Sequence, residues 1–154
     1  MNESDLKDFD LVVSLVIPGV PTAKGRPRFA RAGKFVRVYT PKETVSAENF
    51  IRLMFYENYP LHTILTGALR MDLFAFMPIP KSTPKKLAAI METERVAHIK
   101  KPDRSNIMKL VEDALHLCYV DDCQIYCGWF SKHYSPFPRL EIKIYKPKEQ
   151  VDSI

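Results

Sequence analysis

The chain of 154 residues is poor in the features that mark secreted and membrane proteins. Its three cysteines are an odd number, and they crowd into one short region, which is unlike a disulfide framework. No apolar run approaches the roughly 20 residues that span a bilayer. The polar start MNESDLKDFD lacks the basic and apolar segments of a signal peptide. We therefore expect a cytoplasmic protein with reduced thiols and no membrane contact.

Acidic residues are absent between Asp10 and Glu43, and the whole chain has a formal net charge of +5. The basic side chains of this interval predict salt-dependent contacts to DNA phosphates, although a solvated basic loop has the same composition. Phe29, Phe35 and Tyr39 are interleaved with the charges, and we expect these aromatic side chains to return to the core rather than to stack on DNA. The basic residues of the interval are Lys24, Arg26, Arg28, Arg31, Lys34, Arg37 and Lys42.

Apolar periodicity predicts an α+β fold, in which a mixed β-sheet packs with helices in a single domain at residues 11–154. Residues 1–10 have no such periodicity, so we expect a flexible N-terminus. Residues 21–40 are predicted as a long loop with a short strand at 34–39. The other predicted strands are 11–17, 68–77, 123–132 and 140–145, and the predicted helices are 41–57, 83–91 and 104–117.

The segment KPDRSNIMKLVEDALHLCYVDDCQ, residues 101–124, is dense in carboxylates. Asp103 begins the predicted helix and Asp122 precedes the next strand, and a helix followed by a returning strand can bring these two side chains together. Divalent cations such as Mg²⁺ need oxygen ligands held close to one another. On the polar face of the helix, Asn106 can bind a phosphate oxygen and Lys109 can stabilise charge on a scissile phosphate.

Each of these residues also has an ordinary structural explanation. Asp103 has the sequence position of a helix N-cap, worth about 1 kcal/mol. Lys109 and Asp113 have the spacing of a surface ion pair, and Asp121 with Asp122 suits a turn before a strand. The three cysteines lack the spacing of structural zinc sites, so buried or half-buried thiols are expected there. Spacing alone leaves the structural and the catalytic explanations open.

The same residues resemble the central signature of the RusA-type Holliday junction resolvases, which runs Lys-Pro-Asp-x-Asp-Asn, then Lys, Asp-Ala-Leu and Asp-Asp-x-Gln. The segment IPGVPTAKGRPRF at residues 17–29 is similar to the family's N-terminal strand and Pro-x-x-Lys-x-Arg-Pro-Arg loop, and RLEIKIY at 139–145 is similar to its last strand. The matching signature residues are Lys101, Pro102, Asp103, Asn106, Lys109, Asp113, Ala114, Leu115, Asp121, Asp122 and Gln124.

The resemblance implies a RusA-like fold and a Mg²⁺-dependent endodeoxyribonuclease that resolves four-way DNA junctions in recombination and repair. Mn²⁺ is an expected substitute ion, and no small-molecule cofactor is expected. A homodimer is implied as well, and it suits a substrate with two-fold symmetry. By motif position, the metal ligands fall on Asp103 and Asp122, with Asp121 as a further ligand, and the catalytic lysine on Lys109. Lys101, Asn106 and the basic residues from Lys24 to Arg37 are expected to bind DNA.

One position departs from the signature, because Ser105 stands where the family has a second aspartate. Carboxylate count tunes metal affinity, so the change should weaken a metal site. Either Asp121, Asp113 or Asp72 supplies the missing carboxylate, or a serine hydroxyl and water suffice. The other hypotheses are a non-catalytic junction-binding protein, kept for junction recognition or phage regulation, and a nuclease for other branched or single-stranded DNA.

Overall fold

The computed structural model describes residues 6–32 and 34–148, apart from the side chains of Ala32 and Arg37. Its main sheet has the order β1-β7-β4, and β5 and β6 share the other edge of β4. β7 is antiparallel to β1 and β4, whereas β5 and β6 are parallel to β4, so the predicted mixed sheet is confirmed. The strands are β1 (Phe9–Pro18), β4 (Leu69–Pro78), β5 (Ile125–Cys127), β6 (Phe130–Ser135) and β7 (Arg139–Pro147).

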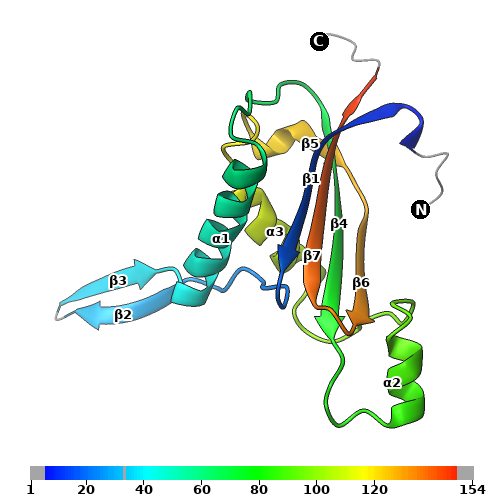
Figure 1. Ribbon diagram of the computed structural model, residues 1–154. Coiled ribbons are helices and arrows are strands. Elements are labelled where there is room, and N and C mark those ends of the chain that lie inside the picture. The colour runs from blue at the N-terminus through cyan, green and yellow to red at the C-terminus, as the bar shows by residue number, and fades with distance from the viewer. Residues whose placement is uncertain (1–5, 33, 149–154) are drawn as a thin grey trace.

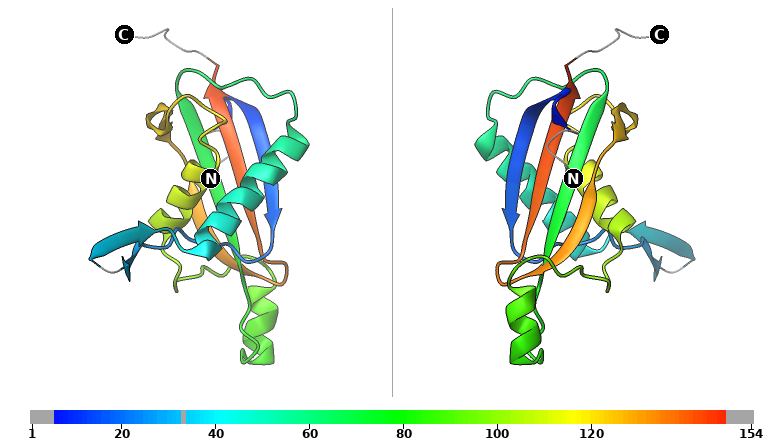
Figure 2. Two further views of the ribbon diagram at one scale, coloured as in Figure 1. Left: turned by 90° about the vertical axis from the view of Figure 1, so that its left-hand side faces the viewer. Right: turned by 90° about the vertical axis from the view of Figure 1, so that its right-hand side faces the viewer.

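Two helices, α1 (Lys42–Asn58) and α3 (Arg104–Ala114), cover one face of this sheet, as Figures 1 and 2 show. The short helix α2 (Lys85–Met91) lies beyond the end of β4 (Figure 1). Every second residue of β4 is buried under the helices, which confirms the predicted alternation. Within the described residues, no helix is both long and apolar enough to cross a membrane.

Away from this body, β2 (Arg28–Ala32) and β3 (Phe35–Tyr39) form an antiparallel hairpin, here called the arm (Figures 1 and 2). Phe29 is 72% exposed and Phe35 is 79% exposed, and Tyr39 is exposed as well. The prediction that these aromatic residues return to the core is therefore wrong. A hairpin that projects from the sheet has no second layer against which to bury them.

Several element boundaries differ from the predicted ones. β1 begins at Phe9, inside the segment predicted to be flexible, whose residues 1–5 lie outside the described part of the chain. α3 ends at Ala114, because the chain then turns through a Leu115–Cys118 backbone hydrogen bond of 2.7 Å and buries Tyr119 in the core. The strand predicted at 123–132 is divided into β5 and β6.

A buried carboxylate explains the division between β5 and β6. Gly128 lies so close to β4 that a Cβ atom there would be 1.9 Å from the carbonyl oxygen of Met71. The next amide, that of Trp129, donates a hydrogen bond of 2.8 Å to Oδ1 of Asp72, which has no exposed surface. Arg70 donates to both oxygens of the same carboxylate, at 2.9 Å and 3.2 Å. The hydrogen bond to Asp72 is the largest cause that raises the pKa of Arg70.

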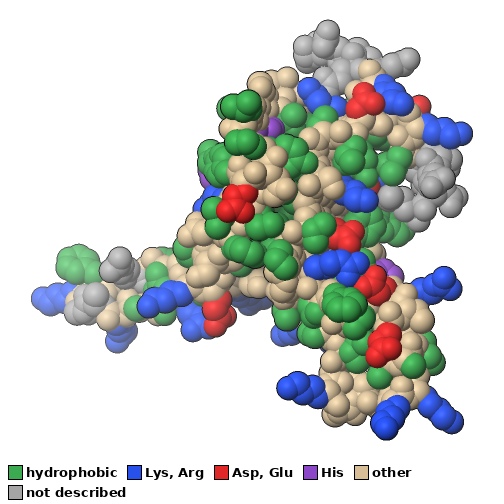
Figure 3. All heavy atoms as spheres, in the orientation of Figure 1, with side chains coloured by type: hydrophobic (Ala, Val, Ile, Leu, Met, Phe, Trp, Pro, Cys, Tyr) green, Lys and Arg blue, Asp and Glu red, His purple; other side chains and the backbone are tan. Residues whose placement is uncertain are grey.

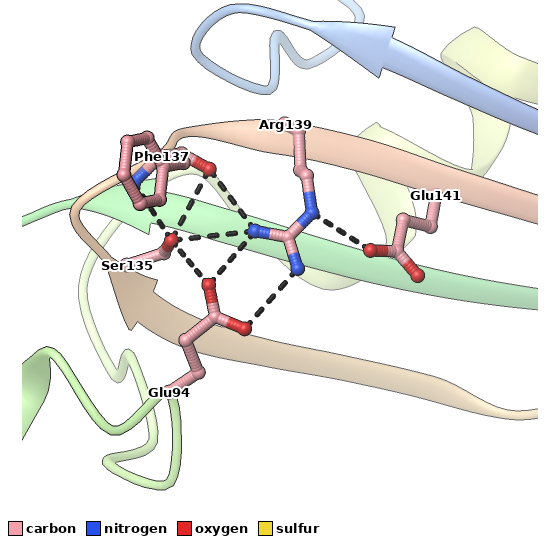
Figure 4. Close-up of polar contacts among 5 residues, drawn as sticks. All are labelled: Glu94, Ser135, Phe137, Arg139 and Glu141. Carbon is pink, nitrogen blue, oxygen red and sulfur yellow. Dashed lines mark hydrogen bonds and ion pairs between the residues drawn. The ribbon is translucent and has the colours of Figure 1, made fainter.

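A second ionic network fixes the loop after α2 to the end of the sheet, as Figure 4 shows. Nη1 of Arg139 lies 2.8 Å from Oε1 of Glu94, and its Nε lies 2.7 Å from Oε1 of Glu141. The guanidinium also lies 3.7 Å from the centre of the Phe76 ring. Hydrogen bonds from Arg139 and then from Ser135 lower the pKa of Glu94. The network has a structural role, because it connects the loop that carries Glu94 to Arg139 in β7.

The Asp72 carboxylate should be a large contributor to stability. We expect Asp72→Asn to lower the free energy of unfolding by about 3 to 5 kcal/mol, because it removes one charge of a buried ion pair. Urea denaturation followed by circular dichroism measures this change. Asp10→Asn, the same chemical change at an exposed strand position, is the control and should stay within about 0.5 kcal/mol. Equal effects of the two substitutions would contradict the structural role of Asp72.

Candidate functional site

A polar pocket with a volume of about 550 Å³ opens at the start of α3. Its walls come from the loop before the arm and from the start of α3, two segments that lie far apart in the sequence. Four of the residues predicted from the sequence therefore face one space. The pocket is lined by Arg26, Lys101, Pro102, Asp103 and Asn106.

Backbone contacts hold the loop that carries Arg26 in this position. The amide of Lys24 donates to the carbonyl oxygen of Asn106 at 2.9 Å, and the amide of Gly25 donates to Oγ1 of Thr44 at 3.0 Å. A Cβ atom at Gly25 would lie 2.9 Å from Cγ of Pro41, so the close packing against α1 favours glycine. The loop is thus anchored to both helices before it reaches the arm.

The side chain of Lys24 supports the same anchoring. It forms ion pairs with Asp113 and, at 3.8 Å, with Glu48. The helical spacing suggested an ion pair between Asp113 and Lys109. Among the described ion pairs, Asp113 instead pairs with Lys24. Lys24 was predicted to bind DNA, and Asp113 was a candidate for the missing metal ligand. Both side chains instead take part in the ion pairs that connect the loop to α1 and α3.

Lys132 of β6 is a residue of this region that sequence reasoning missed. Its ammonium donates to the carbonyl oxygens of Lys100 and Pro102, at 2.5 Å and 2.6 Å. Burial lowers the pKa of Lys132, and the charge of Asp103 opposes that shift. Lys132 therefore fixes the segment that leads into α3. Nothing in the sequence links it to that segment, because the contact depends on β6 pairing beside β4.

Asp103 occupies the N-cap position of α3, as the ordinary explanation required. Within the described part of the chain, however, its side chain makes no capping hydrogen bond. The residue is exposed, and its carboxylate faces the polar pocket together with Lys101 and Asn106. Its oxygens are therefore not committed to stabilising the helix.

Asp121 has a structural role instead. Its Oδ1 accepts a hydrogen bond of 2.9 Å from the amide of Cys123, and its own amide donates to Oε1 of Gln124 at 2.9 Å. The two bonds form a capping box for the 3₁₀ helix η2 (Asp122–Gln124). A hydrogen bond from the thiol of Cys123, and then the bond from its amide, lower the pKa of Asp121.

The predicted metal ligands Asp103, Asp121 and Asp122 do not form a three-carboxylate centre. Across residues 6–32 and 34–148, no group of three or more His, Cys, Asp or Glu side chains is placed to hold a metal ion. The physical reason lies partly in Asp121, whose carboxylate bonds to the backbone of η2. Asp72 is not a substitute ligand either, because it is buried against Arg70. The assignment of Asp103, Asp121 and Asp122 as metal ligands stays a prediction.

Asp122 lies near a carboxylate that the sequence analysis did not single out. Burial is the main cause that raises the pKa of Glu112, and the charge of Asp122 raises it further, whereas Lys109 lowers it. Helical spacing was the available signal, since Ser105, Lys109 and Glu112 follow each other by one turn and share a face of α3. Glu112 is half-buried on the face where the family signature loses its second aspartate.

The remaining predicted DNA-binding residues lie on the arm. Arg28, Arg31 and Lys34 are exposed there, and Figure 3 shows basic side chains along its length. The backbone of Arg37 belongs to β3, but its side chain lies outside the described residues. The arm is therefore a projecting element that carries positive charge and exposed aromatic rings.

Two comparisons relate the chain to known proteins. The family model described as "Endodeoxyribonuclease RusA" matches residues 18–145. The chain is also similar to "Uncharacterized protein YqaN" of Bacillus subtilis (strain 168), with 35% identity over 135 residues. That alignment covers 86% of this chain and 94% of the relative. The matched region contains the arm, α3 and η2, which together carry the candidate site.

The coupling between Glu112 and Asp122 gives a testable pH effect. Asp122→Asn removes a like charge, so we expect the pKa of Glu112 to fall while burial keeps it above its ordinary value. Lys109→Met should shift the pKa of Glu112 upward, because it removes a favourable positive charge. Side-chain carboxyl chemical shifts measured by NMR across a pH titration report both changes. Shifts of the same sign in the two variants would contradict the described arrangement.

Proposed function

Because the chain belongs to the RusA endodeoxyribonuclease family, we propose that it is a metal-dependent nuclease that resolves four-way DNA junctions as a homodimer. The observation that carries the proposal is the polar pocket at the start of α3. It gathers two cationic side chains, one carboxylate and one amide on a surface open to solvent. Such a set can bind a phosphate group and a hard divalent cation together.

The donor chemistry fits Mg²⁺, with Mn²⁺ as a substitute. Mg²⁺ is commonly held by one or two carboxylates, with substrate phosphates and water completing its shell, so a centre of three protein carboxylates is not required. Asp103 and Asp122 are exposed carboxylates and would hold the ion. When bound, the ion would supply charge neutralisation at the scissile phosphate and acidify a water molecule.

The chain's own cations bind and polarise the substrate. Arg26 and Lys101 would contact phosphate oxygens at the pocket, and Asn106 would orient the phosphate by hydrogen bonding. Lys109 would stabilise the negative charge that builds up as the oxygen of water bonds to phosphorus and the bond to the leaving oxygen breaks. Arg28, Arg31 and Lys34 on the arm would contact the backbone of a DNA branch.

A second function, junction binding without cleavage, is favoured by one observation. Ser105 removes a carboxylate from the signature, and Asp113 and Asp121 are engaged in an ion pair and a cap. A weaker metal site would leave the DNA-binding surface intact. The two functions are separated by the fate of a bound junction and not by its affinity.

The central test uses a synthetic four-way junction with Mg²⁺ or Mn²⁺. We expect resolution into nicked duplexes, and Asp122→Asn should slow it by about 100-fold or more, since even residues that support metal ligands contribute 10- to 100-fold. Denaturing gels measure cleavage, and gel shifts without metal measure binding, which should change little. Asp8→Asn is a matched control away from the pocket. A junction that the unsubstituted chain shifts but leaves uncut with either ion identifies the binding protein instead.

Ser105 gives an independent test of the metal site. Ser105→Asp restores the carboxylate of the signature, so we expect it to lower the Mg²⁺ concentration for half-maximal cleavage by about tenfold, because carboxylate count tunes affinity. Cleavage rates across a Mg²⁺ titration measure the effect. Asparagine has nearly the size of aspartate but no charge, so Ser105→Asn should not lower the Mg²⁺ requirement. An unchanged Mg²⁺ requirement in Ser105→Asp would show that the serine does not weaken the site.

A further inference from the structure

A second pocket, with a volume of about 260 Å³, lies between α3 and the junction of β5 with β6. Aromatic and sulfur-containing side chains make up much of its wall, and two ionisable side chains from α3 border it. None of the roles proposed above uses this pocket. The residues that matter for its chemistry are Arg104, Met108, Glu112, Tyr126, Trp129 and Phe130.

Two of the aromatic rings are unusually accessible for side chains next to the core. Tyr126 is 59% exposed and Trp129 is 45% exposed, whereas Phe130 is half-buried. Burial in the core would have stabilised these rings more than exposure does. Partly exposed aromatic residues that line a concave, partly polar pocket are typical of a ligand site.

The backbone that presents Trp129 is held rigidly. Its amide donates to the buried carboxylate of Asp72 at 2.8 Å, and its carbonyl oxygen accepts from the amide of Leu73 at 2.8 Å. Gly128 brings the chain against β4 where a Cβ atom would collide with Met71. The backbone at Trp129 is therefore fixed before any ligand arrives, which lowers the ordering cost of binding.

The pocket adjoins the proposed catalytic residues through α3. Arg104, Met108 and Glu112 follow each other at four-residue intervals and face the pocket, and Lys109 is the next residue after Met108. Glu112 interacts electrostatically with both Lys109 and Asp122. Arg104 places a positive charge at the rim, suited to the phosphate that accompanies a nucleotide.

We propose that this pocket receives an unstacked DNA base from the centre of a branched junction, with the base stacking on Trp129 and Tyr126 and its phosphate contacting Arg104. The inference rests on the proposed function, because it places the base beside the scissile phosphate. Stacking on aromatic side chains tolerates every base, since each has a π-face. At the crossover the strands change partners and base stacking is less continuous than inside a duplex, so a base there costs less to unstack.

Trp129 is the single tryptophan of the chain, so its fluorescence reports directly on this pocket. The experiment titrates the full chain with a four-way junction in metal-free buffer, and separately with a fully paired duplex of the same sequence. We expect the junction to quench the fluorescence strongly and the duplex to quench it weakly when equal amounts are bound. Junctions with 2-aminopurine at single positions around the crossover should identify one position whose emission changes on binding.

Substitutions separate stacking from other roles of the tryptophan. Trp129→Phe keeps an aromatic face and should bind the junction within about twofold of the unsubstituted chain. Trp129→Leu should weaken junction binding about tenfold, in line with the loss of one stacked base, and leave duplex binding unchanged. Tyr56→Leu, at an exposed aromatic residue of α1, is the control. Thermal unfolding by circular dichroism confirms that each variant is folded.

Three results would overturn the proposal. They are a saturated junction complex without quenching, equal junction affinity of Trp129→Leu and the unsubstituted chain, and a Trp129 signal that changes with protein concentration alone because a second copy covers the pocket. The measurements need no cleavage, so they remain valid if the chain only binds junctions. Conversely, a chain that cleaves junctions without quenching keeps the proposed function and loses only the base pocket.

Discussion

Asp72 places a carboxylate with no exposed surface in the central strand of the sheet, and much of the site depends on how that charge is compensated. A buried charge is costly unless it is paired and hydrogen-bonded. Arg70 and the amide of Trp129 supply both, so the chain is held against β4 at the point where β5 gives way to β6. Asp122 in η2 precedes this division between β5 and β6 in the sequence, and Lys132 follows it. Lys132 in turn holds Pro102, the residue before Asp103.

The charges around α3 are arranged in two groups with different compensation. At its start, the cations of the polar pocket and Lys132 surround Asp103. Further along the helix, the negative charge of Asp122 raises the pKa of Glu112, and the positive charge of Lys109 lowers it. The first group is mainly positive, whereas the second carries two negative charges and one positive charge. The two parts of α3 therefore present opposite net charges to solvent.

The sequence predicted the layers of the fold well, because burial on one face leaves a periodic pattern, as in the alternation of β4. It also identified the segment around Asp103 through its resemblance to a family. It failed for the arm, where Phe29 and Phe35 are apolar yet exposed, since composition does not reveal whether a second layer is present. The cap made by Asp121 and the bonds made by Lys132 were missed as well, because both depend on which backbone atoms the tertiary fold brings near.

The arm has a consequence for dynamics. A two-stranded hairpin without a packed layer is marginally stable on its own, so β2 and β3 should open and exchange their amide hydrogens far more readily than β4 and β7. The loop that leads to the arm is bonded to both α1 and α3, and this anchoring confines such openings to the arm itself. The protein thus combines a hairpin that can change its conformation with a rigid body around α3, so the arm can move while the geometry around α3 stays constant.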